Sequence, residues 1–203
     1  MIPLAAEAAP SAGSGQLILA AVLGIAVVIV LIAWAKWHPF LALILGIGAG
    51  WFEKDYTEYG YEFGTAGGRL DDLASALPRI EARFGKLNPA PTRRIPVLVG
   101  GGGERKTLRL VARYADIWHS FGDAETIEHK LEVLRRHCAD VGRDPAEIEV
   151  STGVRGRGGP GPEQTGPRLR EVGASLFTVG VAGPDPDLSG LRAWIAWRDA
   201  QRD

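Results

Sequence analysis

The chain has 203 residues and a formal net charge of −1, with 23 basic and 24 acidic side chains. This balance, without a basic stripe, argues against a nucleic acid as the partner. A single cysteine, Cys138, excludes an internal disulfide, and its place in an apolar helical pattern predicts a buried, inert thiol. The four histidines lack metal-ligand spacing, so no metal site is predicted.

The charged residues are distributed very unevenly. Residues 1–51 contain only two Lys, Arg, Asp or Glu side chains. Residues 1–16 are small or polar and predict a flexible lead. Residues 17–35 form an uncharged apolar run that is long enough, as a helix, to cross a bilayer core of roughly 30 Å. We therefore predict a transmembrane helix at 17–35, within a membrane segment at 17–45.

A cleaved signal peptide and a buried core helix are the alternatives for this run. A signal peptide carries positive charge before its apolar stretch, whereas here only Glu7 precedes it. Lys36 and His38 follow the run, so the positive-inside tendency predicts a single-pass protein of the cell membrane with its large C-terminal part in the cytoplasm. The lipid bilayer is then a partner through residues 17–35.

The next segments are less regular. Residues 41–51 are apolar and fit either a buried strand or the start of a second membrane helix. Residues 52–63 are aromatic and acidic and are predicted to form a loop. A helix with one apolar face follows, and Pro78 inside it predicts a bend. Its apolar positions are Leu70, Leu73, Leu77, Ile80 and Phe84.

From residue 95 onwards, buried-type strands alternate with amphipathic helices. Strands are predicted at 95–99, 117–120, 148–152 and 175–181. Helices are predicted around 108–115, from about 124 to 141 between an Asp123 N-cap and Gly142, and as a closing helix around Leu188, Leu191, Trp194 and Ile195. The Gly- and Pro-rich residues 154–167 are predicted to form a loop. This alternation indicates βαβ units around a parallel sheet.

The sharpest local feature is the run of glycines from Gly100 to Gly103, between a buried strand and a helix. Glycines let backbone approach a phosphate closely, and the free N–H groups of the following helix carry partial positive charge. Arg105, Lys106 and Thr107 add charge and a donor. The pattern is neither a P-loop nor a dinucleotide fingerprint, so phosphate binding and a tight structural turn both stay open.

Several segments, in this order, resemble the C-terminal half of luciferase-like oxidoreductases, especially F420-dependent members. They read GIGAGWFEKDYTEYGYEFGTAGGRLDDLASALPRI, PVLVGGGGERKTLRLVARYADIWHSFGD, ASLFTVGV and LRAWIAWRD. The resemblance covers about residues 45–203 and implies an α/β fold, a partial (β/α)8 TIM barrel occupying residues 46–203. It also implies coenzyme F420, or alternatively FMN, at the carboxyl ends of the strands.

Carried over by match, the resemblance implies a set of cofactor-binding residues, with Gly101 to Thr107 as the phosphate loop. The implied residues are Gly48, Gly50, Trp51, Gly101, Gly102, Gly103, Glu104, Arg105, Thr107 and Trp118. For Trp51 and Trp118, plain core packing fits equally well. Arg69 and Asp116 could be structural ion-pair partners.

The chain departs from that family at its front. A (β/α)8 barrel typically needs about 250 residues, and the first strands, which in the family supply substrate-side groups and a cis peptide, have no counterpart here. No catalytic residue or substrate is therefore assigned. A half-barrel leaves two sheet edges unpaired, so closure requires a homo-oligomer, a partner half or a rearranged sheet.

The front segment has its own resemblance. LILAAVLGIAVVIVLIAWAKWHPFLALILG resembles the first transmembrane helix and the start of the second in gluconate permeases. Three functions follow as hypotheses: a truncated F420- or FMN-dependent oxidoreductase or monooxygenase fused to a membrane anchor, a permease-derived fragment without catalysis from a chimeric or truncated gene, and a membrane-anchored binding module. We expect weak cofactor binding at best, and no turnover, from the isolated chain.

Overall fold

The computed structural model describes residues 44–201 apart from 92, 156–158 and 182. The predicted flexible lead and the apolar run at 17–35 lie outside these residues, and so does the interpretation of that run as a membrane span. Within the described part of the chain, no helix combines the length and apolar character that crossing a bilayer requires.

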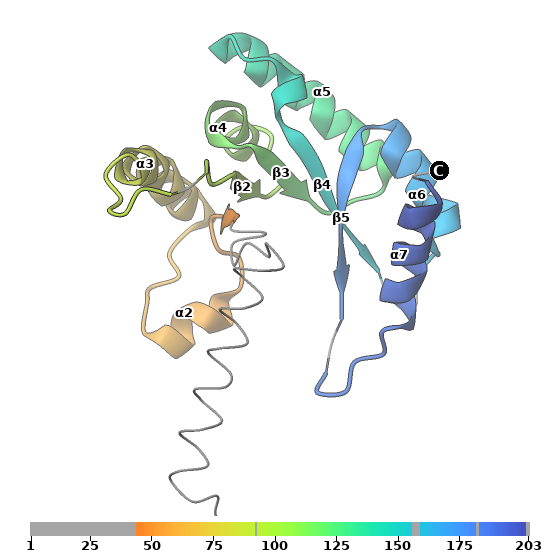
Figure 1. The fold of residues 1–203 in the computed structure, drawn as a ribbon. Coiled ribbons are helices and arrows are strands. Elements are labelled where there is room, and N and C mark those ends of the chain that lie inside the picture. Colours follow the sequence, from red (N-terminus) through yellow and green to blue (C-terminus); the bar gives the residue numbers. More distant parts are fainter. Residues whose placement is uncertain (1–43, 92, 156–158, 182, 202–203) are drawn as a thin grey trace, which may run out of the picture. The chain divides into compact units, whose positions relative to one another are not determined.

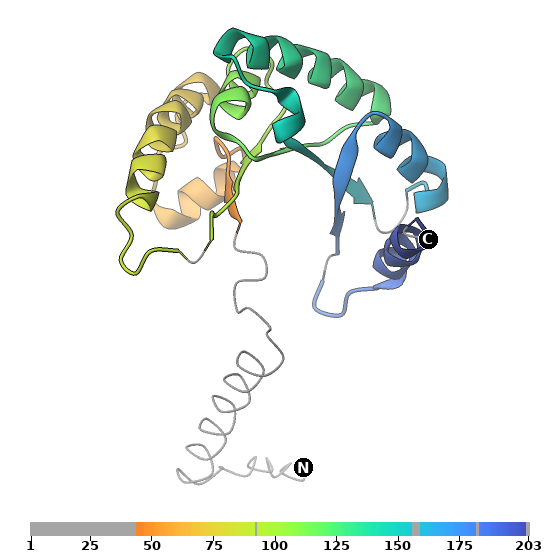
Figure 2. The ribbon, with the colours of Figure 1, turned by 45° about the horizontal axis from the view of Figure 1, so that its top comes forward.

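Five parallel strands form one sheet in sequential order, β1-β2-β3-β4-β5. They are β1 (Leu45–Ile47), β2 (Val97–Gly100), β3 (Ile117–Ser120), β4 (Glu149–Arg155) and β5 (Ala174–Gly180). Sequential parallel strands joined by right-handed crossovers place all their connecting helices on the same face. Figure 2 shows the result, an arc of strands with helices outside it and an open concave face. Over the described residues, β1 and β5 are the edges of the sheet.

The helices cover the convex face of this arc, as Figures 1 and 2 show. They are α3 (Ala66–Phe84), α4 (Thr107–Tyr114), α5 (Ala124–Val141), α6 (Pro162–Glu171) and α7 (Ser189–Ala200), with a short 3₁₀ turn η1 (Pro145–Glu147) before β4. The short helix α2 (Glu53–Tyr59) follows β1 and lies apart from this row. The predicted strand and helix alternation is confirmed from residue 95 onwards, and the ambiguous residues 41–51 include strand β1.

The hydrophobic core lies between the sheet and these helices. Val99 of β2 and Trp118 of β3 are fully buried there, against Leu108, Val111 and Ile127 of the neighbouring helices. Strand side chains alternate between the two faces, so these residues set the convex side of each strand. The apolar positions Leu73 and Leu77 of α3 join the same core. The hydrophobic packing that stabilises the sheet therefore lies on its convex face, between the strands and the helices.

Helix α5 begins and ends where its capping residues predict. The Asp123 carboxylate accepts a hydrogen bond from the Thr126 N–H at 2.9 Å, and Gly142 ends the helix in the left-handed conformation with φ of 69°. Cys138 on this helix is buried, as predicted, and burial raises the pKa of its thiol. The thiol is therefore unreactive at neutral pH.

Two predicted loops contain helices, so those predictions were wrong. Residues 52–63 include α2, which buries no side chain and so shows no apolar periodicity. Residues 154–167 include the end of β4 and the first residues of α6, where Pro162 stands in the first turn and Pro167 lies inside. Proline is well tolerated at the start of a helix because the first N–H groups have no intrahelical partner.

The last helix, α7, packs through a different face from the one expected. Trp194 is buried as predicted, but Ile195 is 40% exposed and Trp197 takes its place in the interior. Phe177 of β5 stacks on Trp194 with ring centroids 5.4 Å apart. The Trp197 ring also lies against α6 at Gly166, where a Cβ atom would come within 2.5 Å of Trp197 Cζ2.

We predict that Gly166→Ala destabilises the protein by about 1–3 kcal/mol, because the added methyl overpacks the contact between α6 and Trp197. Helix propensity alone predicts the opposite sign. Gly67→Ala in the first turn of α3, where the nearest atom is 3.9 Å away, is the control and should be neutral or stabilising. Urea unfolding measures both, and a stabilised Gly166→Ala variant would contradict the packing.

Candidate functional site

The glycine run forms a tight turn at the carboxyl end of β2. Gly101 has φ of 124°, a backbone conformation that side-chain-bearing residues rarely adopt. Its N–H donates to the His119 carbonyl of β3 at 2.9 Å. A Cβ atom at Gly103 would lie 2.8 Å from Thr107 Oγ1. Glycine is therefore required here both by conformation and by close packing against the start of α4.

The second feature of the site is the set of backbone N–H groups that follow this turn. Within the described residues, none of those from Gly102 through Thr107 donates to a carbonyl or a side chain. The first backbone hydrogen bond after them runs from the Leu108 N–H to the Gly103 carbonyl, at 2.9 Å. These groups precede or begin α4, so the helix dipole adds partial positive charge to them. We call residues 102–107 the N–H cradle.

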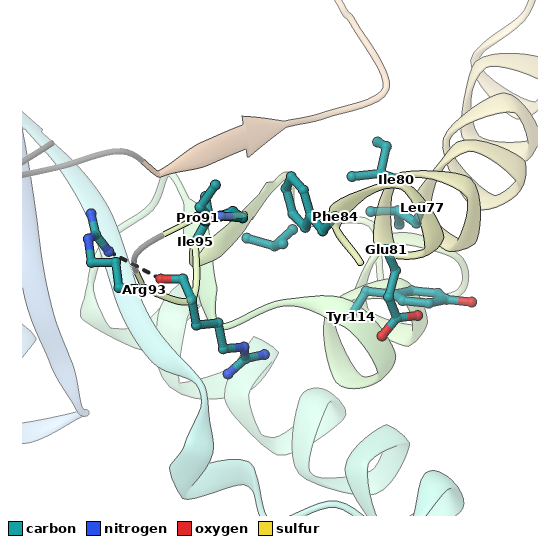
Figure 3. A pocket seen from close by; sticks show the side chains of 10 residues that line it. Leu77, Ile80, Glu81, Phe84, Pro91, Arg93, Ile95 and Tyr114 are labelled. Atoms are coloured by element: carbon teal, nitrogen blue, oxygen red, sulfur yellow. Dashed lines mark hydrogen bonds between the residues drawn. The ribbon is translucent and has the colours of Figure 1, made fainter. Parts of the chain in front are cut away.

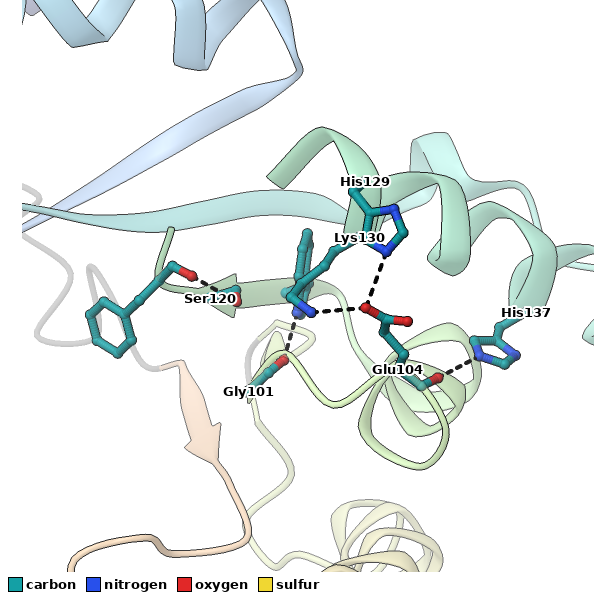
Figure 4. Close-up of polar contacts among 8 residues, drawn as sticks. Gly101, Glu104, Ser120, His129, Lys130 and His137 are labelled. Atoms are coloured by element: carbon teal, nitrogen blue, oxygen red, sulfur yellow. Dashed lines mark hydrogen bonds and ion pairs between the residues drawn. The ribbon is translucent and has the colours of Figure 1, made fainter. Parts of the chain in front are cut away.

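Trp118 of β3 holds the turn in place through a side-chain hydrogen bond. Its side chain is fully buried, and its indole Nε1 donates to the Gly101 carbonyl at 2.9 Å (Figure 4). Together with the bond from Gly101 to His119, this holds both polar groups of the Gly101 backbone on strand β3. The full burial of Trp118 favours core packing and loop positioning for this residue.

Glu104 is an acidic residue inside the N–H cradle, and its carboxylate points toward α5. Glu104 Oε1 accepts hydrogen bonds from Lys130 Nζ and His129 Nε2 of α5, each at 3.2 Å (Figure 4). The Lys130 hydrogen bond is the main cause of a lowered pKa at Glu104. The Glu104 carbonyl accepts from His137 Nε2 at 2.8 Å. Helix α5 thus neutralises Glu104 and leaves its N–H in the cradle.

The two basic residues of the loop behave differently. Lys106 Nζ bonds the Asp71 carboxylate and the Gly67 carbonyl of α3, so it joins two helices. Arg105 is exposed and has no partner within the described residues. Of these two residues, only Arg105 therefore has a side-chain charge that is available to a ligand.

The predicted residues after β1 form a second turn at the same end of the sheet. A Cβ atom at Gly48 would lie 3.6 Å from the Gly100 carbonyl oxygen, which places the ends of β1 and β2 side by side. Gly50 has φ of 66°, and Trp51 is 82% exposed. An exposed Trp51 is compatible with ligand contact and excludes core packing for this residue within the described part of the chain.

Arg69 organises this second turn. Its guanidinium donates to the carbonyls of Gly50 at 2.8 Å and Phe63 at 2.9 Å, and lies 3.7 Å from the centre of the Phe63 ring. Asp116 instead pairs with Arg94 at 2.7 Å and accepts from the Val97 N–H. Arg69 and Asp116 are thus both structural, with separate partners.

A polar pair on the concave face was not predicted from the sequence. His119 Nδ1 lies 2.8 Å from Ser151 Oγ of β4, and Ser151 is fully buried. Burial lowers the pKa of His119. The strand alternation that places Trp118 in the core also places His119 on the opposite face, which was the available signal. The pair lies beside the Gly100 and Gly101 end of β2 through the register of β2 and β3.

Two further cavities lie at opposite ends of the sheet. One of about 920 Å³ is lined by residues at the carboxyl ends of β4 and β5 and by the starts of α5 and α6, including Gly153 and Arg168. The other, of about 380 Å³, lies at the amino end between Leu77, Phe84 and Ile95 (Figure 3). The larger cavity lies at the same end of the sheet as the N–H cradle, and this is the end at which barrel active sites occur. The smaller cavity, at the opposite end, is a gap in apolar packing.

The model of the luciferase-like monooxygenase family matches residues 43–156, more than half of the chain. The chain belongs to the luciferase-like monooxygenase family. The matched region includes the N–H cradle and the turn after β1. Both features of this luciferase-like chain lie at the carboxyl end of its five-stranded sheet.

Curated relatives of this luciferase-like chain come from mycobacteria and are described as uncharacterised proteins. One from Mycobacterium tuberculosis is 31% identical over an alignment of 121 residues, and the match covers 52% of this chain and 41% of the relative. Another from the same species is 26% identical over an alignment of 165 residues, and the match covers 74% of this chain and 56% of the relative. The chain thus spans about half the length of the curated relatives that it matches.

Solved structures confirm the fold. An F420-dependent secondary alcohol dehydrogenase, in complex with an F420-acetone adduct, aligns with a TM-score of 0.65 at 15% identity, over 79% of this chain and 70% of that one. The coenzyme F420-dependent tetrahydromethanopterin reductase of Methanopyrus kandleri aligns with a TM-score of 0.51 at 10% identity, over 76% and 72%. The parallel α/β sheet of this luciferase-like chain thus has the fold of its TIM-barrel neighbours.

We predict that Trp118→Phe destabilises the protein by about 1–3 kcal/mol, because the buried Gly101 carbonyl loses its donor and a small cavity remains. Hydrogen exchange at residues 102–104 should accelerate as well. Trp197→Phe is the matched control, since Trp197 is also buried but its Nε1 has no partner among the described residues. Unchanged exchange in Trp118→Phe would contradict the positioning role.

We also predict that the imidazole of His119 titrates below its ordinary pKa of about 6.5. The unfolded chain then binds a proton that the folded chain resists, so the free energy of unfolding should fall as the pH drops through that value. His119→Gln should lose this part of the pH dependence. NMR titration of the His119 ring protons tests the direction, and a pKa at or above the ordinary value would contradict it.

Proposed function

We propose that this chain binds the phosphate of a deazaflavin cofactor, coenzyme F420, in the N–H cradle and is part of a hydride-transferring oxidoreductase. The observation that carries the proposal is the row of backbone N–H groups from Gly102 through Thr107, which have no acceptor in the described part of the chain. It lies at the carboxyl end of the sheet in a family of cofactor-dependent enzymes. FMN, which also carries a phosphate, is the alternative cofactor.

The residues of the N–H cradle fit a phosphate group. The backbone at Gly102 and Gly103 has no room for side chains, since a Cβ atom at Gly102 would lie 3.0 Å from Lys130 Cε and Ser120 Oγ, and one at Gly103 would lie 2.8 Å from Thr107 Oγ1. The only acidic side chain in the cradle is neutralised by α5. Backbone donors, helix dipole and missing side chains together suit a phosphate.

Hydride transfer is the chemistry that the bound cofactor supplies. In this account the chain binds and orients: Gly102 to Thr107 hold the phosphate, and Trp118 keeps the loop in place. Gly48, Gly50 and Trp51 border the neighbouring strand end, where an exposed indole can cover a ring system. The neutral His119 with Ser151 supplies a polar surface on the concave face. No catalytic residue or substrate is assigned.

The described sheet contains five strands, whereas a closed barrel of this kind has eight. Both edge strands and the concave face therefore need a partner, which can be a second copy or a segment that completes the sheet. For this reason the proposal predicts weak cofactor binding and no turnover from the isolated chain. Substrate-dependent oxidation of reduced F420 by that chain would contradict the second part.

The proposal also includes a membrane anchor at residues 17–35, which would hold the oxidoreductase part at the cytoplasmic side of the cell membrane. Its support is the length and charge pattern of that run. The permease-derived alternative is not favoured, because the family match from residue 43 and the structural neighbours are both those of oxidoreductases. Release of the full chain from membranes by alkaline carbonate would contradict the anchor.

We predict that F420 binds saturably to the full detergent-solubilised chain and that Gly102→Asp weakens this binding at least tenfold, because it adds a negative charge to the cradle and its Cβ atom displaces the loop from Lys130 and Ser120. Gly85→Asp is the matched control, since it adds the same charge at the exposed end of α3. Fluorescence titration with F420 and with FMN measures the affinities. Equal binding by wild-type and Gly102→Asp chains would contradict the cradle.

A further inference from the structure

The Glu104 carbonyl is held by a side chain of helix α5. His137 Nε2 lies 2.8 Å from this carbonyl oxygen, as Figure 4 shows. A carbonyl oxygen can only accept a hydrogen bond, so His137 Nε2 carries the proton and donates it. His137 follows Lys130 by about two helical turns, on the same face of α5. This face of α5 therefore binds Glu104 at its carboxylate, through Lys130, and at its carbonyl, through His137.

The bond from His137 fixes the direction of the next backbone N–H group. The peptide bond between Glu104 and Arg105 is trans, and in a planar trans peptide the C=O and N–H bonds point in opposite directions. Because the Glu104 carbonyl is turned toward α5, the Arg105 N–H is turned away from that helix. This N–H belongs to the cradle and has no acceptor among the described residues. His137 thus orients a cradle donor from the opposite side of the peptide.

The same relation holds at two other peptides of the loop. The Gly101 carbonyl accepts from the Trp118 indole, and the Gly103 carbonyl accepts from the Leu108 N–H, each at 2.9 Å. In both peptides the following N–H points away from the donor and has no acceptor in the described part of the chain. Of the three donors, Trp118 belongs to the buried core and the Leu108 donor is backbone. His137 lies outside that core, so its substitution tests the relation without leaving a core cavity.

We propose that His137 is a positioning residue of the N–H cradle, which directs the Arg105 N–H toward the phosphate without touching the ligand. This inference rests on the proposed function and deepens it, because it names a residue outside the loop on which phosphate binding depends. The effect concerns the phosphate alone, so it is the same for F420 and for FMN. The Nε2 proton is present in the neutral Nε2–H tautomer and in the imidazolium, so the role needs no charge on His137.

The expected size of the effect follows from the loss of one oriented donor to a charged group. Hydrogen bonds of this kind contribute more to binding than those between neutral groups, but the Arg105 N–H is misdirected rather than removed. We therefore expect His137→Leu to weaken the binding of F420 and of FMN about three- to tenfold. His137→Gln keeps an amide N–H donor and should bind within about twofold of the wild type.

The test is a fluorescence titration of the full detergent-solubilised chain with F420 and with FMN, for the wild type, His137→Leu and His137→Gln. The matched control is His129→Leu, which removes the α5 histidine that contacts only the Glu104 carboxylate and leaves Lys130 bonded to it. This control should bind as the wild type does. The number of sites per chain is measured with the affinity, because unfolding lowers the number of sites whereas a misdirected donor lowers the affinity of each site.

A second measurement needs no ligand. The ring ¹⁵N shifts of His137 in the labelled chain should show a proton on Nε2, and the ¹³C signal of the Glu104 carbonyl should move more in His137→Leu than in His137→Gln. A neutral His137 ring with its proton on Nδ1 would contradict the hydrogen bond, and the inference would fail with it.

The titration separates failure of the inference from failure of the proposed function. If Gly102→Asp weakens F420 binding but His137→Leu does not, the cradle binds the phosphate and the positioning role is wrong. If His137→Gln binds as weakly as His137→Leu, or if His129→Leu does, the Nε2–H donor is not the cause and the inference is also overturned. Absence of binding of both cofactors by the wild-type chain would refute the proposed function, and the inference with it.

Discussion

The site depends on how strand β3 holds the backbone of Gly101. The Gly101 N–H donates to the His119 carbonyl, and its carbonyl accepts from the buried indole of Trp118, both at 2.9 Å. With both groups occupied, the chain leaves β2 in a turn that only glycine adopts readily, and the next N–H groups reach α4 without acceptors among the described residues. A core residue thus positions the N–H groups that we propose as an anion site, and it does so by fixing the loop rather than by touching a ligand.

The same geometry explains why the charged residues around the cradle do not act alike. Helix α5 supplies the Lys130 cation that neutralises Glu104, and α3 supplies the carboxylate that engages Lys106. Among the charged side chains of the cradle, Arg105 alone has no partner within the described residues. The local chemistry is selected by which side chains the neighbouring helices have already paired, so a basic sequence alone does not define the site.

The sequence allowed much of the fold to be predicted, because strong periodicity and capping residues act locally. Strand 117–120 and helix α5 between Asp123 and Gly142 have the predicted bounds. Helix α2 was missed because it buries nothing, and the start of α6 because its Pro and Gly residues resemble a loop. In the site, the glycine run was visible, but the roles of Arg69 and His119 depend on partners 19 and 32 residues away.

The most direct test of the account is to measure the amide NMR shifts of the full isotope-labelled chain in detergent as F420 is added. If the cradle binds the phosphate, the largest changes occur at the amides of residues 102–107, with downfield proton shifts as each N–H gains a phosphate acceptor, and the Trp118 indole signal stays in place. Changes that spare these amides, or that occur only at the amino end of the sheet, would contradict it.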